Sequence, residues 1–137
     1  MIPEIVSYNK KQQPDELSIC NMLSNLIDSE FTESKVWHAH PVWFIDGNPI
    51  VGYSKQKPGI RLMFWSGADF EEEKLIPGTG KFKDASVFYT SVSQINEKEI
   101  KLWLKKAKHI QWDYKNLIKR KGKLEKINTA DLSFRIK

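Results

Sequence analysis

Cysteine, long apolar runs and catalytic signatures are what this 137-residue sequence has least of. Its one cysteine, Cys20, excludes an internal disulfide. Its apolar runs are a handful of residues long, far short of the roughly 20 that a membrane-spanning helix needs, so we expect no integral membrane protein. The first residues also lack the pattern of a secretory signal peptide, which is a basic segment followed by an apolar stretch and a cleavage site. We therefore expect a cytoplasmic protein.

Recognisable catalytic spacings are missing too, whether paired carboxylates, a nucleophile beside a base, or a complete set of metal ligands. The run 77–81 ends like a phosphate-binding loop, but Leu75 stands where that motif needs its first glycine. Phe82 stands where it needs a serine or threonine for magnesium. We therefore expect a binding protein rather than an enzyme, although catalytic groups from distant residues would leave no such spacing.

A core of reasonable size is present, because 40% of the residues are hydrophobic. A chain of this length can bury such a core without a metal or a disulfide, and it has no room for a second one. We expect a single domain over residues 1–137, with its core at about 15–122 and a tail at 123–137.

Strand patterns dominate the middle of the chain. Short apolar runs at 42–45, 50–53 and 60–65 are separated by the turn-forming runs 46–49 and 57–59. This pattern predicts an antiparallel meander, which an edge segment at 35–40 and a strand at 85–90 extend.

Strand alternation across these turns assigns side chains to two faces. The apolar face should be covered by helices, and it is expected to carry Val42, Phe44, Val51, Tyr53, Ile60, Leu62 and Phe64. The other face is mixed, and it is expected to carry Trp43, Ile45, Ile50, Gly52, Ser54, Arg61, Met63 and Trp65.

Helical periodicity appears at both ends of the chain. The pattern predicts a helix over 15–27, capped by Asp15 and burying Cys20, after an irregular lead-in over 1–14. Asn96 begins a longer apolar stripe that predicts a helix up to Gly122, with Trp103 packed on the sheet. The fold class expected from these elements is α+β, with the N-terminal and C-terminal helices on one face of the sheet.

The mixed face is the leading candidate for a binding site. Aromatic rings beside a cation favour a small or anionic ligand there. The proposed ligand-binding residues are Trp43, Arg61 and Trp65, with Trp37 and Lys81 at the rim. The alternative is that Trp43 and Trp65 are core residues under a helix, because large aromatic side chains are usually buried.

Two weaker patterns concern metals. Four carboxylates, from Asp69, Glu71, Glu72 and Glu73, could hold iron, although a charged helix start capped by Asp69 is the more common reason for such a cluster. His38 and His40 have a spacing that can chelate a metal from one strand, but a third ligand is not evident.

Positive charge gathers at the C-terminal end. Residues 1–90 hold 9 Lys+Arg against 12 Asp+Glu, and residues 91–137 hold 13 against 5. Lysines on the outside of a helix are most often solvated, but this end could also bind nucleic acid. The residues concerned are Lys115, Lys119, Arg120, Lys121 and Lys123.

Several of these motifs together resemble the YdhG-like domain family. The resemblance covers roughly 35–122 and lies in WHAHPVW at 37–43, VGY at 51–53, RLMFWSG at 61–67, GKFKDA at 80–85 and WDYKNL at 112–117. It implies an α+β fold likened to frataxin, with some relatives regarded as iron-binding chaperones. It implies no catalytic residues.

Overall fold

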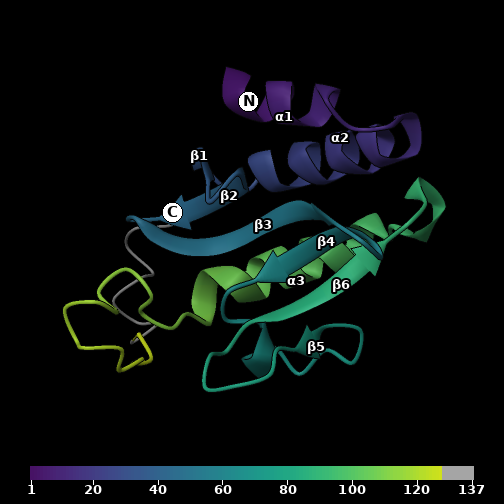
Figure 1. Cartoon of the computed structure of the whole chain (residues 1–137). Coiled ribbons are helices and arrows are strands. Elements are labelled where there is room, and N and C mark those ends of the chain that lie inside the picture. Colours follow the sequence, from purple (N-terminus) through teal and green to yellow (C-terminus); the bar gives the residue numbers. More distant parts are fainter. Residues whose placement is uncertain (128–137) are drawn as a thin grey trace.

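The computed structural model describes residues 1–127, which form an α+β fold built on one sheet (Figure 1). Most of the tail expected at 123–137, from residue 128 on, lies outside the described residues, and so does any strand within it. The elements, in chain order, are α1 (Pro3–Lys10), α2 (Pro14–Asp28), β1 (Glu33–Trp37), β2 (His40–Ile45), β3 (Asn48–Gln56), β4 (Gly59–Phe64), the short 3-10 helix η1 (Gly67–Asp69), β5 (Ile76–Pro77), β6 (Ala85–Tyr89), a second 3-10 helix η2 (Val92–Gln94) and α3 (Glu97–His109).

The sheet has six strands in the order β1-β2-β3-β4-β6-β5, and every neighbouring pair is antiparallel. The predicted meander and the strand at 85–90 are confirmed. Between β1 and β2 the chain reverses through His38 and Ala39, whose φ angles are 51° and 69°. The next hairpin turns through Asp46 and Gly47, also at positive φ, a conformation that suits tight hairpins.

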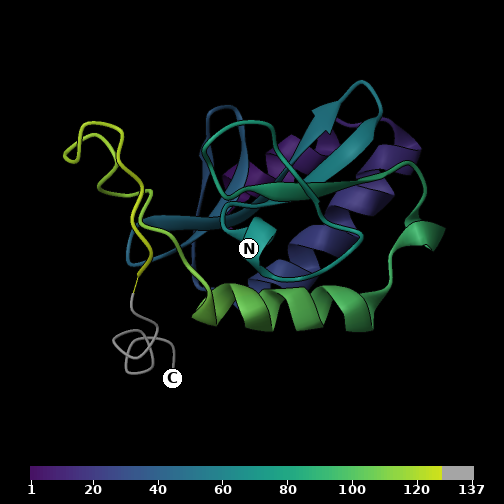
Figure 2. The ribbon, with the colours of Figure 1, turned by 90° about the horizontal axis from the view of Figure 1, so that it is seen from below.

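One face of the sheet is covered by α2 and α3, as predicted, and α1 packs beside β1 and β2. Figure 2 shows α3 running along one side of the sheet, while the segment after it turns away at one end. The core between the layers joins helix residues such as Leu23 and Trp103 to sheet residues such as Leu62 and Phe64. Within the described residues 1–127, no helix covers the opposite face of the sheet.

The first residues are helical, so the expected irregular lead-in over 1–14 is wrong. Pro3 and Pro14 each begin a helix, because proline fits the first helical turn, where no intrahelical partner exists for its missing N–H. The residue before α2 is Gln13, so Asp15 lies inside the first turn and is not the cap. Ile5 is fully buried, which explains why α1 docks.

The assignment of β2 side chains to faces is wrong. Phe44 pairs with Pro49, but Trp43 pairs with Val51, so Ile50 is an extra residue in β3. This bulge inverts the alternation on the far side of the turn. Trp43 therefore lies in the core under the helices, whereas Val42 and Phe44 lie on the open face. The assignments of Val51, Tyr53, Ile60, Leu62 and Phe64 to the covered face are confirmed.

The C-terminal helix is shorter than predicted. Asn96 caps α3 by accepting a hydrogen bond from the Glu99 N–H, but the helix ends at His109 and the chain is extended at Ile110. Tertiary hydrogen bonds replace helical ones beyond that point: the Trp112 N–H donates to the Ser66 hydroxyl at 2.9 Å, and the Tyr114 N–H donates to Asn48 Oδ1 at 3.0 Å. The apolar residues of the sequence therefore keep a helical spacing beyond His109, although the chain there is no longer helical.

None of the helices within residues 1–127 combines the length and apolar character that a membrane span requires.

Candidate functional site

A pocket of about 490 Å³ lies on the open face of the sheet. Its floor comes from strand residues whose side chains point away from the helices, and one end is formed by the segment after α3. Aromatic and aliphatic side chains predominate, which is typical of sites for small organic molecules. The lining residues are Lys35, Trp37, Phe44, Gly47, Pro49, Met63, Trp65, Phe82, Asp84, Tyr114, Lys115, Leu117 and Ile118.

The aromatic rings form a continuous surface along one side. The Trp37 ring centroid lies 5.6 Å from that of Phe44 and 6.3 Å from that of Trp65. On the other side of Trp65, His40 is stacked at 6.4 Å. These spacings fit tilted and edge-on ring contacts, which hold each ring in a defined orientation. The rings of Trp37 and Trp65 remain partly accessible to solvent.

Gly52 lies under this surface, where β3 approaches β2 closely. A Cβ atom at Gly52 would lie 2.5 Å from the Pro41 carbonyl oxygen, whereas its distance of 3.4 Å from Cζ3 of Trp65 would be an ordinary contact. Only glycine therefore allows the two strands this separation without displacing the backbone of β2.

The end wall of the pocket is tied to the sheet by Asn48, which is buried. Its Oδ1 accepts hydrogen bonds from the backbone N–H groups of Tyr114 and Lys115, both at 3.0 Å. Its Nδ2 donates to Gln111 Oε1 at 3.2 Å and to the Trp112 carbonyl at 3.0 Å. One side chain thus fixes four groups of the segment after α3.

Tyr114 adds a second attachment. Its hydroxyl donates to the Trp65 carbonyl at 2.6 Å and accepts from the Lys83 N–H at 2.9 Å. Burial raises the pKa of Tyr114 to about 12, so the hydroxyl stays protonated and remains a donor even at alkaline pH. The Phe82 ring lies 6.2 Å from the Tyr114 ring and borders the same pocket.

Three charged side chains line the pocket. Lys35 Nζ lies over two aromatic rings, 5.1 Å from the Phe44 centroid and 5.7 Å from that of Trp37. Lys115 Nζ donates to the Asp46 carbonyl oxygen at 2.7 Å. Asp84 pairs with Arg61, with 3.5 Å between Oδ2 and Nη2.

The five ligand-binding residues predicted from sequence are divided by this geometry. Trp37 and Trp65 line the pocket together. Arg61 does not line it but reaches it through Asp84, and its Nη2 lies 3.0 Å from Met63 Sδ. Lys81 does not line the pocket either. Its Nζ donates to the Gly122 carbonyl at 3.2 Å and lies 5.6 Å from the ring centroid of Phe82, which does line the pocket. Trp43 is fully buried in the core, with its indole N–H donating to Asp28, so its placement on the ligand face is wrong.

Several lining residues had no distinct signal in the sequence. The strand alternation placed Met63 on this face but gave it no role, and it placed Phe44 on the wrong face. Tyr114 and Leu117 were expected on a helix. Lys35 could have been found, because it alternates with Trp37 on the edge strand and therefore shares its face.

The four predicted acidic residues are engaged separately. Asp69 Oδ2 accepts a hydrogen bond from the Trp112 indole at 2.7 Å, and it ends η1 rather than capping a helix. Glu72 pairs with Lys106, which lowers the pKa of that carboxyl group. Glu71 and Glu73 are exposed. Iron binding at this cluster stays a prediction from the sequence.

His38 lies in the β1–β2 turn and His40 begins β2, so the pair is not carried by a single strand. His38 is exposed at positive φ, and its ring packs on Trp37 at 4.2 Å between centroids. Burial lowers the pKa of His40, which favours the neutral imidazole. Within residues 1–127 no three His, Cys, Asp or Glu side chains gather as a metal site would require.

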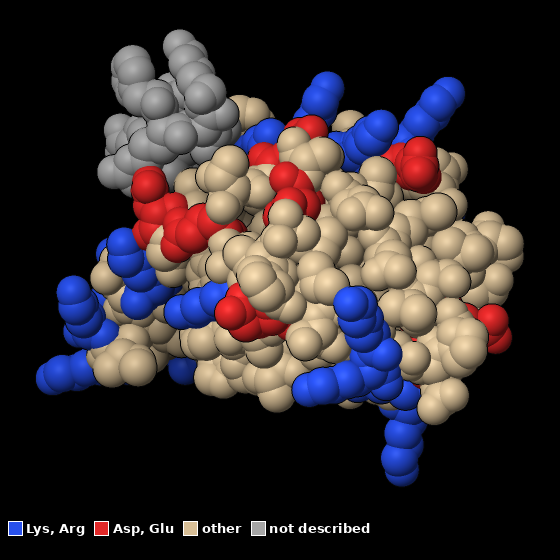
Figure 3. Space-filling view, turned by 90° about the horizontal axis from the view of Figure 1, so that it is seen from above, with Lys and Arg blue, Asp and Glu red and all other residues tan. Residues whose placement is uncertain are grey.

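The basic residues predicted to bind nucleic acid lie on turns rather than on a helix. Arg120 pairs with Asp113 at 2.5 Å and with Glu125 at 3.3 Å, so part of this charge is compensated locally. On the face seen in Figure 3, Lys and Arg side chains project in separate groups with neutral surface between them. Nucleic-acid binding also stays a prediction.

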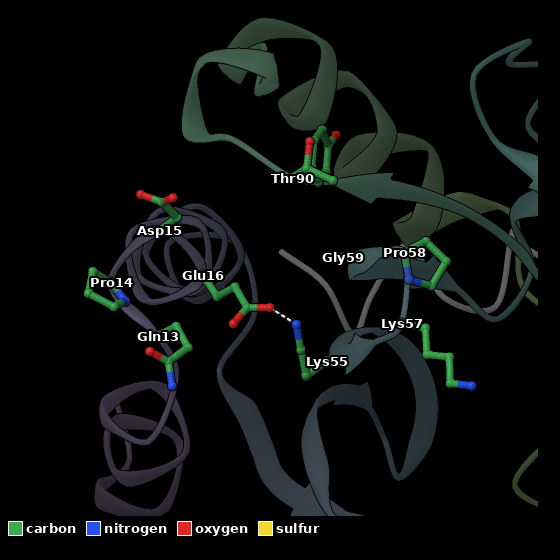
Figure 4. Close-up of a pocket in the computed structure, with 10 residues that line it drawn as sticks. Gln13, Pro14, Asp15, Glu16, Lys55, Lys57, Pro58, Gly59 and Thr90 are labelled. Carbon is green, nitrogen blue, oxygen red and sulfur yellow. Dashed lines mark hydrogen bonds and ion pairs between the residues drawn. The ribbon is translucent and has the colours of Figure 1, made fainter.

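A second pocket, of about 500 Å³, lies between the start of α2 and the β3–β4 turn (Figure 4). Glu16 and Lys55 form an ion pair across it, while the Asp15 side chain points away. Its labelled side chains are polar or charged, apart from Pro14 and Pro58. Tyr89 also lines this pocket but is buried, so the pocket offers a flat organic ligand less aromatic surface than the first pocket does.

Comparison with family models, with curated proteins and with solved structures finds no match for this chain. The likeness to the YdhG-like domain family and to frataxin therefore stays an expectation from the sequence motifs.

Proposed function

We propose that this protein binds a small organic molecule with a flat, apolar body on the open face of its sheet. The observation that carries the proposal is the pocket itself: about 490 Å³ in volume, and lined by aromatic side chains at fixed positions. Sites for small ligands have this size and this composition.

The positions of the rings support binding rather than packing. Trp37 and Trp65 contact each other and their neighbours, yet both keep part of their surface exposed within the pocket. At the pocket's end Ile118 is 93% exposed, so an apolar ligand would cover surface that now faces water. Burial of such surface contributes about 25 cal/mol per Å².

The framework around the pocket also favours a preformed site. Asn48 and Tyr114 fix the end wall through hydrogen bonds to the sheet, and Gly52 allows the close approach of β3 to β2 beneath the rings. A site that is ordered before binding loses less conformational entropy when a ligand enters.

The test is a fluorescence titration with N-phenyl-naphthylamine, a neutral and flat aromatic probe. We expect saturable binding with one site, weakened at least about tenfold by Trp65→Ala, because a stacking surface is removed. Phe88→Ala is the matched control: Phe88 lies on the same face of the sheet, opposite Arg61, and is 41% exposed but outside the pocket. The proposal would be ruled out if both variants lost the same affinity for the probe, or if the wild-type protein showed no saturable binding.

A further inference from the structure

We infer that the ligand is an organic anion and that its acidic group lies beside Lys35. This inference rests on the proposed function, because it concerns the same pocket. It adds the chemical class of the ligand and its orientation, with the flat apolar body on the rings of Trp37 and Trp65.

The charge of Lys35 is not balanced by a neighbouring acid. Among the ion pairs formed by residues 1–127, none includes Lys35. Its Nζ instead lies over the rings of Phe44 and Trp37. Contact with an aromatic face attracts a cation but does not neutralise it. An ammonium group is thus held at the pocket wall with its charge available.

The charges around the pocket do not balance. Asp84, which lines the pocket, faces Arg61 at 3.5 Å. Glu33 lies on the same face of β1 and keeps its negative charge, with its Oε1 accepting the Gly47 N–H at 3.2 Å, at the β2–β3 turn. Lys115 contributes a second positive charge to the lining, and its Nζ donates to the Asp46 backbone carbonyl at 2.7 Å. Three cations, Lys35, Lys115 and Arg61, therefore face two carboxylates, which leaves a positive excess.

An aromatic pocket can also select a cationic ligand, by placing the cation against the ring faces. Here that role is already taken, because Lys35 lies over two of the rings. A second cation entering the pocket would meet the repulsion of Lys35 and Lys115. An anion would instead be attracted by both, so the geometry favours an acid over an amine.

The experiment compares two probes with the same ring system. Anilinonaphthalene sulfonate carries one negative charge, and N-phenyl-naphthylamine carries none. We expect the sulfonate to bind the wild-type protein more tightly, and we expect Lys35→Gln to weaken binding of the sulfonate about two- to fivefold and to change binding of the neutral probe by less. Lys57→Gln is the control, because Lys57 is an exposed lysine at the second pocket.

Two further measurements sharpen the result. Lys35→Glu should weaken the sulfonate more than Lys35→Gln does, because attraction becomes repulsion. Raising the salt concentration should weaken the sulfonate but not the neutral probe, because exposed charges are screened. The inference is overturned if the sulfonate has no advantage over the neutral probe, or if Lys35→Gln affects both probes equally.

Failure of this inference differs from failure of the proposed function. One outcome is that Trp65→Ala weakens the neutral probe, while Lys35→Gln does not weaken the sulfonate. The pocket then binds flat organic molecules, and only the inference that its ligand is an anion is wrong. If neither probe depends on Trp65, the pocket does not bind flat organic molecules at all.

Discussion

Asn48 accepts the backbone N–H of Tyr114 at 3.0 Å, across 66 positions of sequence. This bond joins the first residue of β3 to a segment that lies beyond the end of α3. The amide of Asn48 can make such a bond and three others at once, because it has both an acceptor oxygen and two donor hydrogens. One side chain therefore supplies four of the hydrogen bonds that position the end wall of the pocket.

Replacing Asn48 should loosen that wall. Asn48→Ala leaves buried groups unpaired, so we expect the free energy of unfolding to fall by about 1 to 3 kcal/mol. Amide hydrogen exchange at Tyr114 and Lys115 should become faster, because these two N–H groups donate to Asn48 in the wild-type protein. Asn25→Ala is the control, since Asn25 is exposed on α2. Unchanged exchange at both amides would show that other contacts hold the segment.

Adding a methyl group at Gly52 should disturb the aromatic surface. The new Cβ would lie 2.5 Å from the Pro41 carbonyl oxygen, so the backbone of β2 or β3 must move. We expect Gly52→Ala to cost about 1 to 3 kcal/mol in chemical denaturation and to weaken the neutral probe. Ser54→Ala, on the same strand but half-exposed, should change both by little. Equal stability of the two variants would contradict the close approach.

Truncating Trp103 should be strongly destabilising. Trp103 is fully buried and meets Phe64 edge-on at 6.1 Å between centroids. Phe44, which the strand alternation assigned to the covered face, does not pack with Trp103, because Phe44 lies on the open face. Trp103→Ala should lower the free energy of unfolding by about 3 to 5 kcal/mol, through lost burial and a cavity.

Two lysines of α3 serve as controls for that variant. Lys105→Ala should cost less than about 0.5 kcal/mol, because Lys105 is exposed. Lys108 pairs with Glu30 at 2.9 Å, so Lys108→Ala should cost up to about 1 kcal/mol. A denaturation midpoint for Trp103→Ala equal to that of Lys105→Ala would refute the packing.

Alkaline pH should destabilise the fold partly through Cys20. Burial raises the pKa of the Cys20 thiol to about 12, whereas an exposed thiol loses its proton near about 8.5. Between these values the unfolded chain binds fewer protons than the folded one, so stability falls as pH rises. The contribution is fully present below about 8.5 and is lost as pH rises toward 12.

The measurement has two parts. At pH 8 a thiol reagent should modify Cys20 only after denaturant is added, because the native thiol is buried and protonated. In Cys20→Ala the fall of stability above about pH 8.5 should be shallower. Rapid modification of the native protein would mean that the thiol is accessible.

The sequence by itself determined the class of fold. Alternating apolar runs between Asp46-Gly47 and Lys57-Pro58 specified hairpins, because turn chemistry and strand periodicity are local properties. The same locality explains why the start of α3 at Asn96 and the burial of Cys20 could be predicted. Part of the site was predicted in the same way, since Trp37 and Trp65 do lie on one face and line one pocket.

Only the tertiary structure decided what completes that pocket. The bulge at Ile50 exchanged the faces of Trp43 and Phe44, and a bulge depends on how two strands pair rather than on either strand's own pattern. The end of α3 at His109 was decided in the same way, because Asn48 and Ser66 offer the following backbone hydrogen bonds that the helix would otherwise have supplied. Ser66 lies 46 positions before its partner Trp112, and Asn48 lies 66 positions before its partner Tyr114. Local periodicity cannot predict contacts between residues so far apart in the sequence.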